Sequence, residues 1–384
     1  MNPKVSVIMP IYNVEKYLQQ SLLSVIHQTM RDIEILCIND GSTDSSGKIL
    51  EYYSEKDSRI RIVTTPNKGY GHAMNIGLRE AKGEYIGIVE PDDYVDTRMF
   101  EYLYDMAKIQ GADIVKADFY RFTTPLNGKM IKYYQSVVDE DTYYNRLLHP
   151  EEYKKIFRFV MNIWCGIYKR KLIIDNNIYF NESAGAAFQD NGFWFQTLCF
   201  CKAIYFVKIP FYMNRRDNVN SSVNNLGNLY AINNEFQYIK RFLLSRPELK
   251  DIYLVGYQIK KYQTYKFNIS RCPGYLLDEY ITTISKEWKK DCETGDLKPD
   301  FFREDEWKEI SMIKNTPDIY ISQIEKGRVE DNNTTDLKLY QEGTAEYELN
   351  EIKKSFSYKI GLFITKIPRK IKSLQEKKNG KKEV

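Results

Sequence analysis

Residues 85–93 read Tyr-Ile-Gly-Ile-Val-Glu-Pro-Asp-Asp, an apolar run of strand length that ends in three carboxylates. Carboxylates at the mouth of a buried strand repel one another and lose hydration, so a fold keeps them mainly where a positive charge sits. A divalent cation is the usual partner of such a cluster. The stretch therefore predicts a buried strand whose carboxyl end carries a cation-dependent site.

Apolar runs of similar length recur along the first third of the chain. Besides residues 85–89, we expect strands at four places: Val5–Ile11, Ile33–Ile38, Arg61–Thr64 and Asp113–Lys116. Apolar residues at helical spacing fill the intervals, so the pattern is one of repeated β-α units. Such units predict an α/β fold, with a mostly parallel, doubly wound sheet and helices on both faces.

The polar loops that follow these strands are expected to meet at one place. In such sheets ligands bind at the carboxyl ends of the strands, because parallel strands end at the same rim. Four loops directly follow strands and share that rim: Pro10–Asn13, Asn39–Asp44, Pro66–Gly71 and Glu90–Asp93.

The overall composition excludes several classes of protein. A net charge of +4 is too small to imply nucleic-acid binding. The six cysteines show no paired metal-ligand spacing, so we expect free thiols in a reducing compartment. The N-terminus has no secretory pattern, and no stretch reaches the ~18 apolar residues of a spanning helix. We therefore expect a cytoplasmic protein.

Five short motifs in a fixed order carry a resemblance to a known family. They are Pro10–Asn13, Asn39–Asp44, Asn67–Gly69 with Ala73 and Asn75, Gly83–Ile86 and Glu90–Asp93. This series resembles glycosyltransferase family 2, the nucleotide-sugar-dependent transferases of the GT-A fold. The resemblance is tight over about Lys4–Val95 and extends loosely to about Ser222. It implies a GT-A fold and an inverting transfer of a sugar.

The resemblance also implies a domain plan. We expect a GT-A domain over residues 1–225, with a nucleotide-binding half over about 1–117 and an acceptor-binding half over about 118–225. The tyrosine-rich helical pattern that follows predicts a helical domain over 226–320. Residues 321–384 are expected to form a polar linker and a basic tail.

Seven residues on the first three loops are expected to bind a UDP-sugar donor. Tyr12 can offer a ring for uracil to stack on, and Asp40 an acceptor for the N3–H of the base. Tyr12 could equally be a strand-end core residue, and Asp40 a turn former before Gly41. His72 could touch the donor phosphates or sugar, or simply pack. The resemblance adds four more positions: Pro10, Asn13, Asn67 and Gly69.

The acidic cluster resembles the Asp-x-Asp element of the family. We expect Asp92, with Asp93 alongside, to hold Mn²⁺ or Mg²⁺ together with diphosphate oxygens. Glu90 stands where the family more often has Asp, and its longer side chain is expected to contact ribose or sugar. The alternative is a solvated turn without a metal.

The resemblance places a catalytic base later in the chain. The family usually carries a Glu-Asp pair before a helix, and here the pair reads Gln189-Asp190. Asp190 is therefore the candidate general base, and a plain helix N-cap is the alternative. Arg216, with Arg215, lies in a late polar loop, where an arginine could close over the diphosphate.

The C-terminal tail predicts a membrane contact. Between residues 353 and 374, apolar side chains recur at helical spacing and basic side chains fill the other face. Such a helix can lie in an anionic membrane interface, although it could also dock on protein. We expect peripheral attachment to the inner face of the plasma membrane, with no part spanning it.

Together these features predict an inverting hexosyltransferase that uses a UDP-sugar and Mn²⁺ or Mg²⁺. Its acceptor is expected to be a saccharide carried on a lipid, in bacterial surface polysaccharide synthesis. Two alternatives stay open. Substitutions at Glu90 and Gln189 would also suit a catalytically silent carbohydrate-binding protein. Gly69-Tyr70-Gly71 before a helix hints at a dinucleotide-dependent oxidoreductase, although a third glycine is missing.

Overall fold

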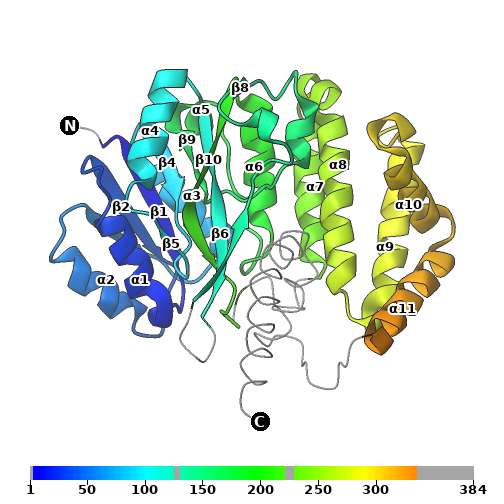
Figure 1. Ribbon diagram of the computed structural model, residues 1–384, viewed down its shortest axis with the longest axis horizontal. Coiled ribbons are helices and arrows are strands. Elements are labelled where there is room, and N and C mark those ends of the chain that lie inside the picture. Colours follow the sequence, from blue (N-terminus) through cyan, green and yellow to red (C-terminus); the bar gives the residue numbers. More distant parts are fainter. Residues whose placement is uncertain (1–2, 125–129, 220, 222–228, 335–384) are drawn as a thin grey trace, which may run out of the picture.

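A mixed sheet forms the centre of the computed structural model, which describes residues 3–124, 130–219, 221 and 229–334 (Figure 1). Its strand order is β3-β2-β1-β4-β9-β6-β10-β5, with β7 paired to β6 and β8 to β10. The strands are β1 (Val5–Ile11), β2 (Ile33–Asn39), β3 (Ile60–Thr64), β4 (Tyr85–Ile88), β5 (Tyr94–Val95), β6 (Ile114–Thr123), β7 (Ile131–Gln135), β8 (Leu147–Leu148), β9 (Gly166–Lys169) and β10 (Ile204–Arg215).

The α/β class predicted from the sequence is confirmed, and the parallel part is the N-terminal one. Strands β3, β2, β1 and β4 all run parallel. Strand β9 is antiparallel to both β4 and β6, and β6 and β10 are parallel to each other. The sheet is therefore mixed beyond β4. Strand β6 also extends to Thr123, beyond the strand expected at Asp113–Lys116, and pairs with β7.

Helices cover both faces of the parallel part. They are α1 (Glu15–Ile26), α2 (Ser46–Ser54), α3 (Tyr70–Glu80) and α4 (Met99–Gln110). Helix α3 brings Gly77 against the side chain of Ile8, whereas α4 brings Phe100 against Gly87. Ile8 pairs with the neighbour of Gly87 in the register, so these two residues face opposite sides of the sheet. Helices α3 and α4 therefore lie on opposite faces, and all seven residues of β1 are buried.

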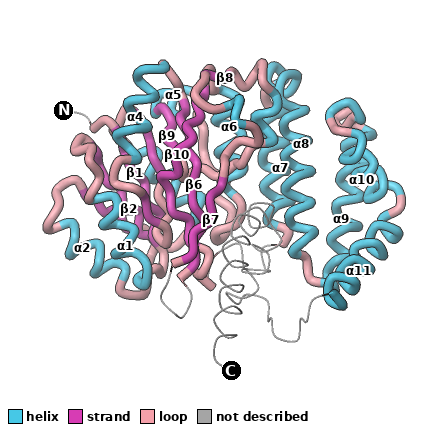
Figure 2. Tube along the Cα trace, viewed as in Figure 1, coloured by secondary structure: helices cyan, strands magenta, loops and turns pink. Residues whose placement is uncertain are grey.

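Two further helices belong to the α/β part: α5 (Arg170–Asp175) and α6 (Gln189–Phe200). A layer of helices then completes the described chain (Figure 2). Its members are α7 (Ala231–Leu244), α8 (Pro247–Arg271), α9 (Gly274–Glu293), α10 (Glu304–Asn315) and α11 (Pro317–Thr334). Helix α8 docks tightly on the α/β part, since a Cβ at Gly256 would lie 2.6 Å from the ring of Phe157. Helix α11 runs across residue 320, where we expected the helical domain to end and the polar linker to begin.

The predicted basic helix between residues 353 and 374 lies outside the described residues. Within the described ranges, no helix is both long and apolar enough to cross a membrane.

The contact between Gly87 and Phe100 gives a test of the fold. A Cβ at residue 87 would lie 2.4 Å from the Phe100 ring. We expect Gly87→Ala to lower the free energy of unfolding by about 1–3 kcal/mol, because a packed core must shift to admit the methyl group. Thermal unfolding followed by circular dichroism would measure this.

Gly274 at the start of α9 is the matched control, because its Cβ would meet nothing within 4 Å. Gly274→Ala should change the stability by no more than about 0.5 kcal/mol. Equal midpoints for the two variants would contradict the packing described here.

Candidate active site

The sheet register brings the predicted rim together. Ile11 at the end of β1 pairs with Asn39 at the end of β2, and the Asp40 N–H donates to the Ile11 carbonyl at 2.9 Å. Strand β4 lies on the other side of β1 and leads into Glu90. The loops after these strands therefore lie side by side, as predicted.

The first loop offers one ring to a ligand and uses its other groups internally. The Tyr12 side chain is 47% exposed at the rim. Asn13 has a φ of 49°, and its side-chain oxygen accepts from the backbone N–H of Thr43 at 2.8 Å. Pro10 is buried within β1. We therefore revise the expectation for Pro10 and Asn13: both shape the rim, and Tyr12 is the group that a base could stack on.

Asp40 fixes the loop after β3. Its two carboxylate oxygens accept from the backbone N–H groups of Lys68 at 2.9 Å and Gly69 at 2.8 Å. Each oxygen of a carboxylate has a second lone pair, so these bonds leave room for a further donor. Asn67, on the same loop, is exposed.

Gly69, which we expected to bind the donor, approaches another loop of the chain. Its φ is 95°, and a Cβ there would lie 2.9 Å from the backbone of Gly185. A Cβ at Gly71 would lie only 2.0 Å from the carbonyl oxygen of Asn181. Glycine is needed at both positions, because residues 181–185 pack directly on the start of α3 and leave no room for a side chain.

Side chains tie this 181–188 loop in place. Glu182 accepts from Asn75 at 2.9 Å and lies 3.1 Å from Nδ1 of His72, so His72 contacts the loop. Gln189 accepts from the Ala187 N–H at 2.6 Å and donates to the Ser183 hydroxyl at 3.0 Å. The residue that replaces the expected glutamate therefore holds the loop that precedes Asp190.

Glu90 lies at the centre of the acidic cluster. Its carboxylate accepts from the Tyr70 hydroxyl at 2.7 Å. Burial raises the pKa of Glu90 to about 8, and the nearby charges of Asp92 and Asp190 add to the rise. Residues 90 and 190, which are far apart in the sequence, thus belong to one electrostatic site.

Asp93 differs from its neighbour Asp92 and is corrected as a metal ligand. It is 2% exposed, and its oxygens accept from the Arg215 N–H at 2.6 Å and the Asn214 amide at 3.1 Å. Burial and the charge of Asp92 raise the pKa of Asp93 well above its usual value. Its carboxylate therefore anchors the end of β10 and is largely used by these bonds. Asp92 is partly exposed and accepts from the Asn218 amide at 2.8 Å.

The two adjacent arginines have different surroundings. The Arg215 Nε donates to the Asp92 carbonyl at 2.8 Å, and its guanidinium lies over the rings of Tyr17 and Phe122. Arg216 is partly exposed, and its guanidinium makes no hydrogen bond or ion pair with the described residues. Arg215 therefore holds the cluster in place, while Arg216 is the arginine that can turn toward a ligand.

Asp190 occupies the first turn of α6 at the edge of this cluster. Burial raises the pKa of Asp190 to about 6, while hydrogen bonds to Asn191 and the charge of Lys116 limit the rise. A carboxylate with this pKa is ionised at neutral pH and is a stronger base than an ordinary aspartate.

Glu235 of α7 supports the start of α6, a role that the sequence does not indicate. Its carboxylate accepts from the Gly192 N–H at 3.0 Å and from the Asn181 amide at 2.8 Å. A Cβ at Gly192 would lie 2.2 Å from this carboxylate, so glycine is needed there. Tyr70 and Lys116 were also missed as site residues, although both stand at or just after predicted strand ends.

The residues present fit a divalent cation that takes few of its ligands from the protein. The charges of Asp92 and Asp190 raise the pKa of Glu90, and a nearby cation would relieve this repulsion. Within the described ranges, no group of three or more ligating side chains is preformed for a metal. Asp92 with few protein partners suits Mg²⁺ or Mn²⁺, which take most of their ligands from phosphates and water.

Comparison with known proteins finds a family match over this region. Residues 6–171 match the model of glycosyl transferase family 2. The uncharacterized glycosyltransferase EpsJ of Bacillus subtilis is 36% identical over 184 residues, which cover 47% of this chain and 52% of EpsJ. The cholesterol galactosyltransferase of Borreliella burgdorferi is 33% identical over 233 residues, which cover 57% of this chain and 63% of that protein. The chain thus spans only about half to two-thirds of these relatives.

Among solved structures, S. aureus TarS 1-349 matches with a TM-score of 0.48 and 18% identity. The match covers 82% of this chain and 90% of that structure.

The bonds of Gln189 predict how firmly the 181–188 loop is held. We expect Gln189→Ala to loosen it, because the variant loses the bonds to Ala187 and Ser183 at about 0.5–1.5 kcal/mol each. Hydrogen–deuterium exchange should become about tenfold faster in peptides from this loop and from the start of α3. Ala184→Ser, at an exposed position in the same loop, is the control and should exchange like the wild type. Unchanged exchange in Gln189→Ala would show that the loop is held by other contacts.

Proposed function

Since residues 6–171 of this chain belong to glycosyl transferase family 2, we propose that the protein is an inverting glycosyltransferase. It moves a hexose from a UDP-sugar to a hydroxyl of a saccharide acceptor. The observation that carries the proposal is the convergence of Glu90, Asp92 and Asp190 at the carboxyl end of β4, beside an exposed Tyr12.

Asp190 is the general base of the proposed reaction. Its carboxylate takes the proton of the acceptor hydroxyl, and the acceptor oxygen bonds to the anomeric carbon of the donor sugar. The bond from that carbon to the diphosphate breaks at the same time, and UDP leaves with the electron pair. Attack opposite to the leaving group inverts the anomeric centre. The partial exposure of Asp190, in an otherwise buried first turn of α6, supports this role, because it lets the carboxylate reach a bound hydroxyl.

The diphosphate side of the site belongs to Asp92 and Arg216. Asp92 would hold Mn²⁺ or Mg²⁺, and a bound cation there neutralises charge on a leaving diphosphate. Arg216 supplies a further positive charge, because its guanidinium has no partner among the described residues. Glu90 stays bonded to Tyr70, so its second oxygen is the one that can accept from a sugar or ribose hydroxyl.

Tyr12 and Asp40 form the proposed uracil site. The exposed ring of Tyr12 can stack on the base. Asp40 is held rigidly by the loop amides of Lys68 and Gly69, which orients a remaining lone pair for the N3–H of uracil. Asn67 lies exposed on the same loop and can contact the nucleotide. His72 has a supporting role through Glu182.

The name of one relative bears on the hexose and on the acceptor. One relative is named a cholesterol galactosyltransferase, which supports a hexose donor and an acceptor with a lipid part. We propose a saccharide acceptor carried on a lipid, used at the inner face of the membrane in surface polysaccharide synthesis.

The oxidoreductase alternative is disfavoured by the glycine contacts. A dinucleotide site needs the glycine-rich turn to be open to a pyrophosphate. Residues 181–185 of the chain itself cover Gly69 and Gly71. The silent binding protein is disfavoured by Asp190, whose raised pKa of about 6 suits a base.

The role of Asp92 can be tested by nucleotide binding. We expect UDP to bind in the presence of Mn²⁺ and to lose about tenfold or more in affinity when EDTA removes the metal. In Asp92→Ala the affinity should be low with or without Mn²⁺, because the cation has lost its protein ligand. Isothermal titration calorimetry measures the UDP affinity of the wild type and of the variant, each with and without Mn²⁺. Asp105→Ala, on the exposed face of α4, is the control and should behave as the wild type. Metal-dependent binding retained in Asp92→Ala would remove Asp92 from the site.

The role of Asp190 predicts a pH profile. The base must be ionised, so the transfer rate should fall as the pH drops through about 6, where Asp190 gains its proton. Asp190→Asn should lower the rate by about 10²–10⁴-fold and abolish that limb of the profile. UDP binding should persist in the variant. A rate within a few-fold of the wild type would mean that another group takes the proton.

A further inference from the structure

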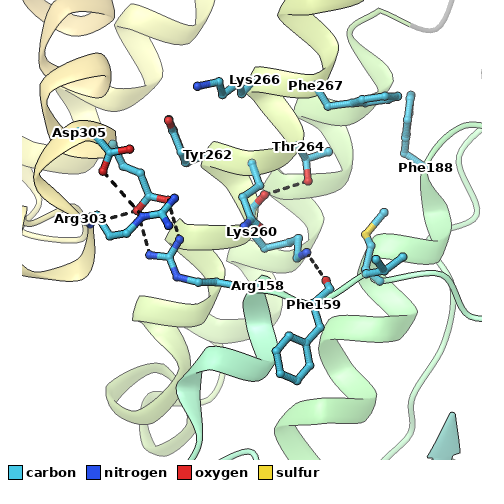
Figure 3. A pocket seen from close by; sticks show the side chains of 14 residues that line it. Arg158, Phe159, Phe188, Lys260, Tyr262, Thr264, Lys266, Phe267, Arg303 and Asp305 are labelled. Carbon is cyan, nitrogen blue, oxygen red and sulfur yellow. Dashed lines mark hydrogen bonds and ion pairs between the residues drawn. The ribbon is translucent and has the colours of Figure 1, made fainter. Parts of the chain in front are cut away.

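A cavity of about 550 Å³ opens between α8, the segment of residues 158–161 and the start of α10 (Figure 3). Cavities of this size hold small molecules in other proteins. It differs from the rim at the ends of β1, β2 and β4, because its walls come from other elements. One lining residue, Phe188, connects the two, since it directly precedes α6, the helix that carries Asp190 in its first turn.

Lys260 is a buried basic side chain in the wall of this cavity. It is 6% exposed, and its ammonium donates to the Phe159 carbonyl at 2.9 Å, as Figure 3 shows. The ring of Trp194 lies 5.0 Å away. Burial and the charges of Lys116 and Arg158 lower the pKa of Lys260 to about 7. An ammonium has three donors, so one hydrogen bond leaves it capable of binding an anion.

The other charges around the cavity do not neutralise Lys260. Arg158 donates to both oxygens of Glu306 at 2.6 and 2.9 Å. Arg303 also donates to Glu306 at 3.0 Å and pairs with Asp305 at 3.7 Å. Two carboxylates therefore match the two guanidinium groups, and none of these ion pairs involves Lys260.

Apolar side chains, among them Phe188, line part of the wall. Phe188 and Met161 are partly buried, while Phe267 is 48% exposed and Val160 is 40% exposed. Exposed apolar groups beside polar donors suit a sugar ring, which presents C–H faces as well as hydroxyls. The cavity thus combines an apolar wall with the buried side chain of Lys260.

The geometry points to an acceptor subsite in this cavity for an acidic sugar residue, whose carboxylate or phosphate binds Lys260 while its ring packs against Phe188 and Phe267. This inference rests on the proposed glycosyltransferase function, because it assigns the cavity to the acceptor. It makes the acceptor saccharide anionic.

Phe188 would transmit the position of the bound sugar to the base. It has a φ of 64°, which aromatic residues rarely adopt, and its carbonyl accepts from the Asn191 N–H at 3.1 Å. Asp190 lies between these two residues. An acceptor that packs on Phe188 is therefore held against the same turn that carries the base.

Binding of simple sugars to the full chain tests the inference. Glucuronic acid and glucose 6-phosphate should bind more tightly than glucose, and Lys260→Met should weaken both acids by about tenfold or more, the usual effect of losing a charge-assisted hydrogen bond. Affinity for glucose should stay within about twofold in that variant, because methionine keeps the length and the packing of lysine. Saturation-transfer NMR and calorimetry would give these affinities. Lys171→Met, at a 77% exposed side chain on α5, is the control and should bind like the wild type.

Phe267→Ala provides a second variant at an exposed position, in case Lys260→Met does not fold. It should weaken acidic and neutral sugars alike, because it removes only the apolar wall. Equal affinity of the wild type for glucose and glucuronic acid would overturn the inference. So would competition by inorganic phosphate as strong as that by glucose 6-phosphate, since the cavity would then be a general anion site.

A failure of the proposed glycosyltransferase function would give a different result from a failure of the acceptor assignment. If the wild type bound no UDP in the presence of Mn²⁺, the glycosyltransferase proposal would fail, whatever the sugars did. If UDP bound normally and acidic sugars showed no preference, only the acceptor assignment would fail.

Discussion

The crowding of carboxylates at the carboxyl end of β4 is the constraint on which the rest of the site depends. Burial removes hydration from Glu90, Asp93 and Asp190, and the charge of the partly exposed Asp92 acts on Glu90 and Asp93. Such surroundings favour the protonated forms of the three buried groups. The fold handles each group in its own way: Tyr70 bonds to Glu90, backbone and amide donors hold Asp93, and α6 positions Asp190. Asp92 is left as the carboxylate best placed for a cation.

Segments distant in sequence build this arrangement. Residues 181–188 pack on the glycines at the start of α3, and Gln189 and Glu235 hold the two ends of the turn that carries Asp190. Helix α7 thus acts on the site although it lies outside the α/β part. The helical layer is therefore a structural component of the site. The cavity beside α8 is the proposed extension of that site toward the acceptor.

Much of the N-terminal fold is predictable from the sequence, because β1 to β4 are continuous apolar runs separated by helical spacing. Strand β7 was missed because none of its five residues is buried, so no apolar run marks it in the sequence. The site was predictable as a set of loops, but the roles within it were not. Asp92 and Asp93 look alike in sequence, and only the return of β10 with Asn214 and Arg215 separates them. Similarly, the partner of Gly69 is Gly185, and no local pattern points to it.

The most direct measurement is a crystal structure with UDP and Mn²⁺, in which anomalous scattering locates the metal. We expect one Mn²⁺ bound by Asp92 and by the diphosphate, with the uracil ring stacked on Tyr12 and Asp93 unchanged beneath β10. A metal bound by Asp93, or a nucleotide bound elsewhere on the molecule, would contradict this assignment of the site.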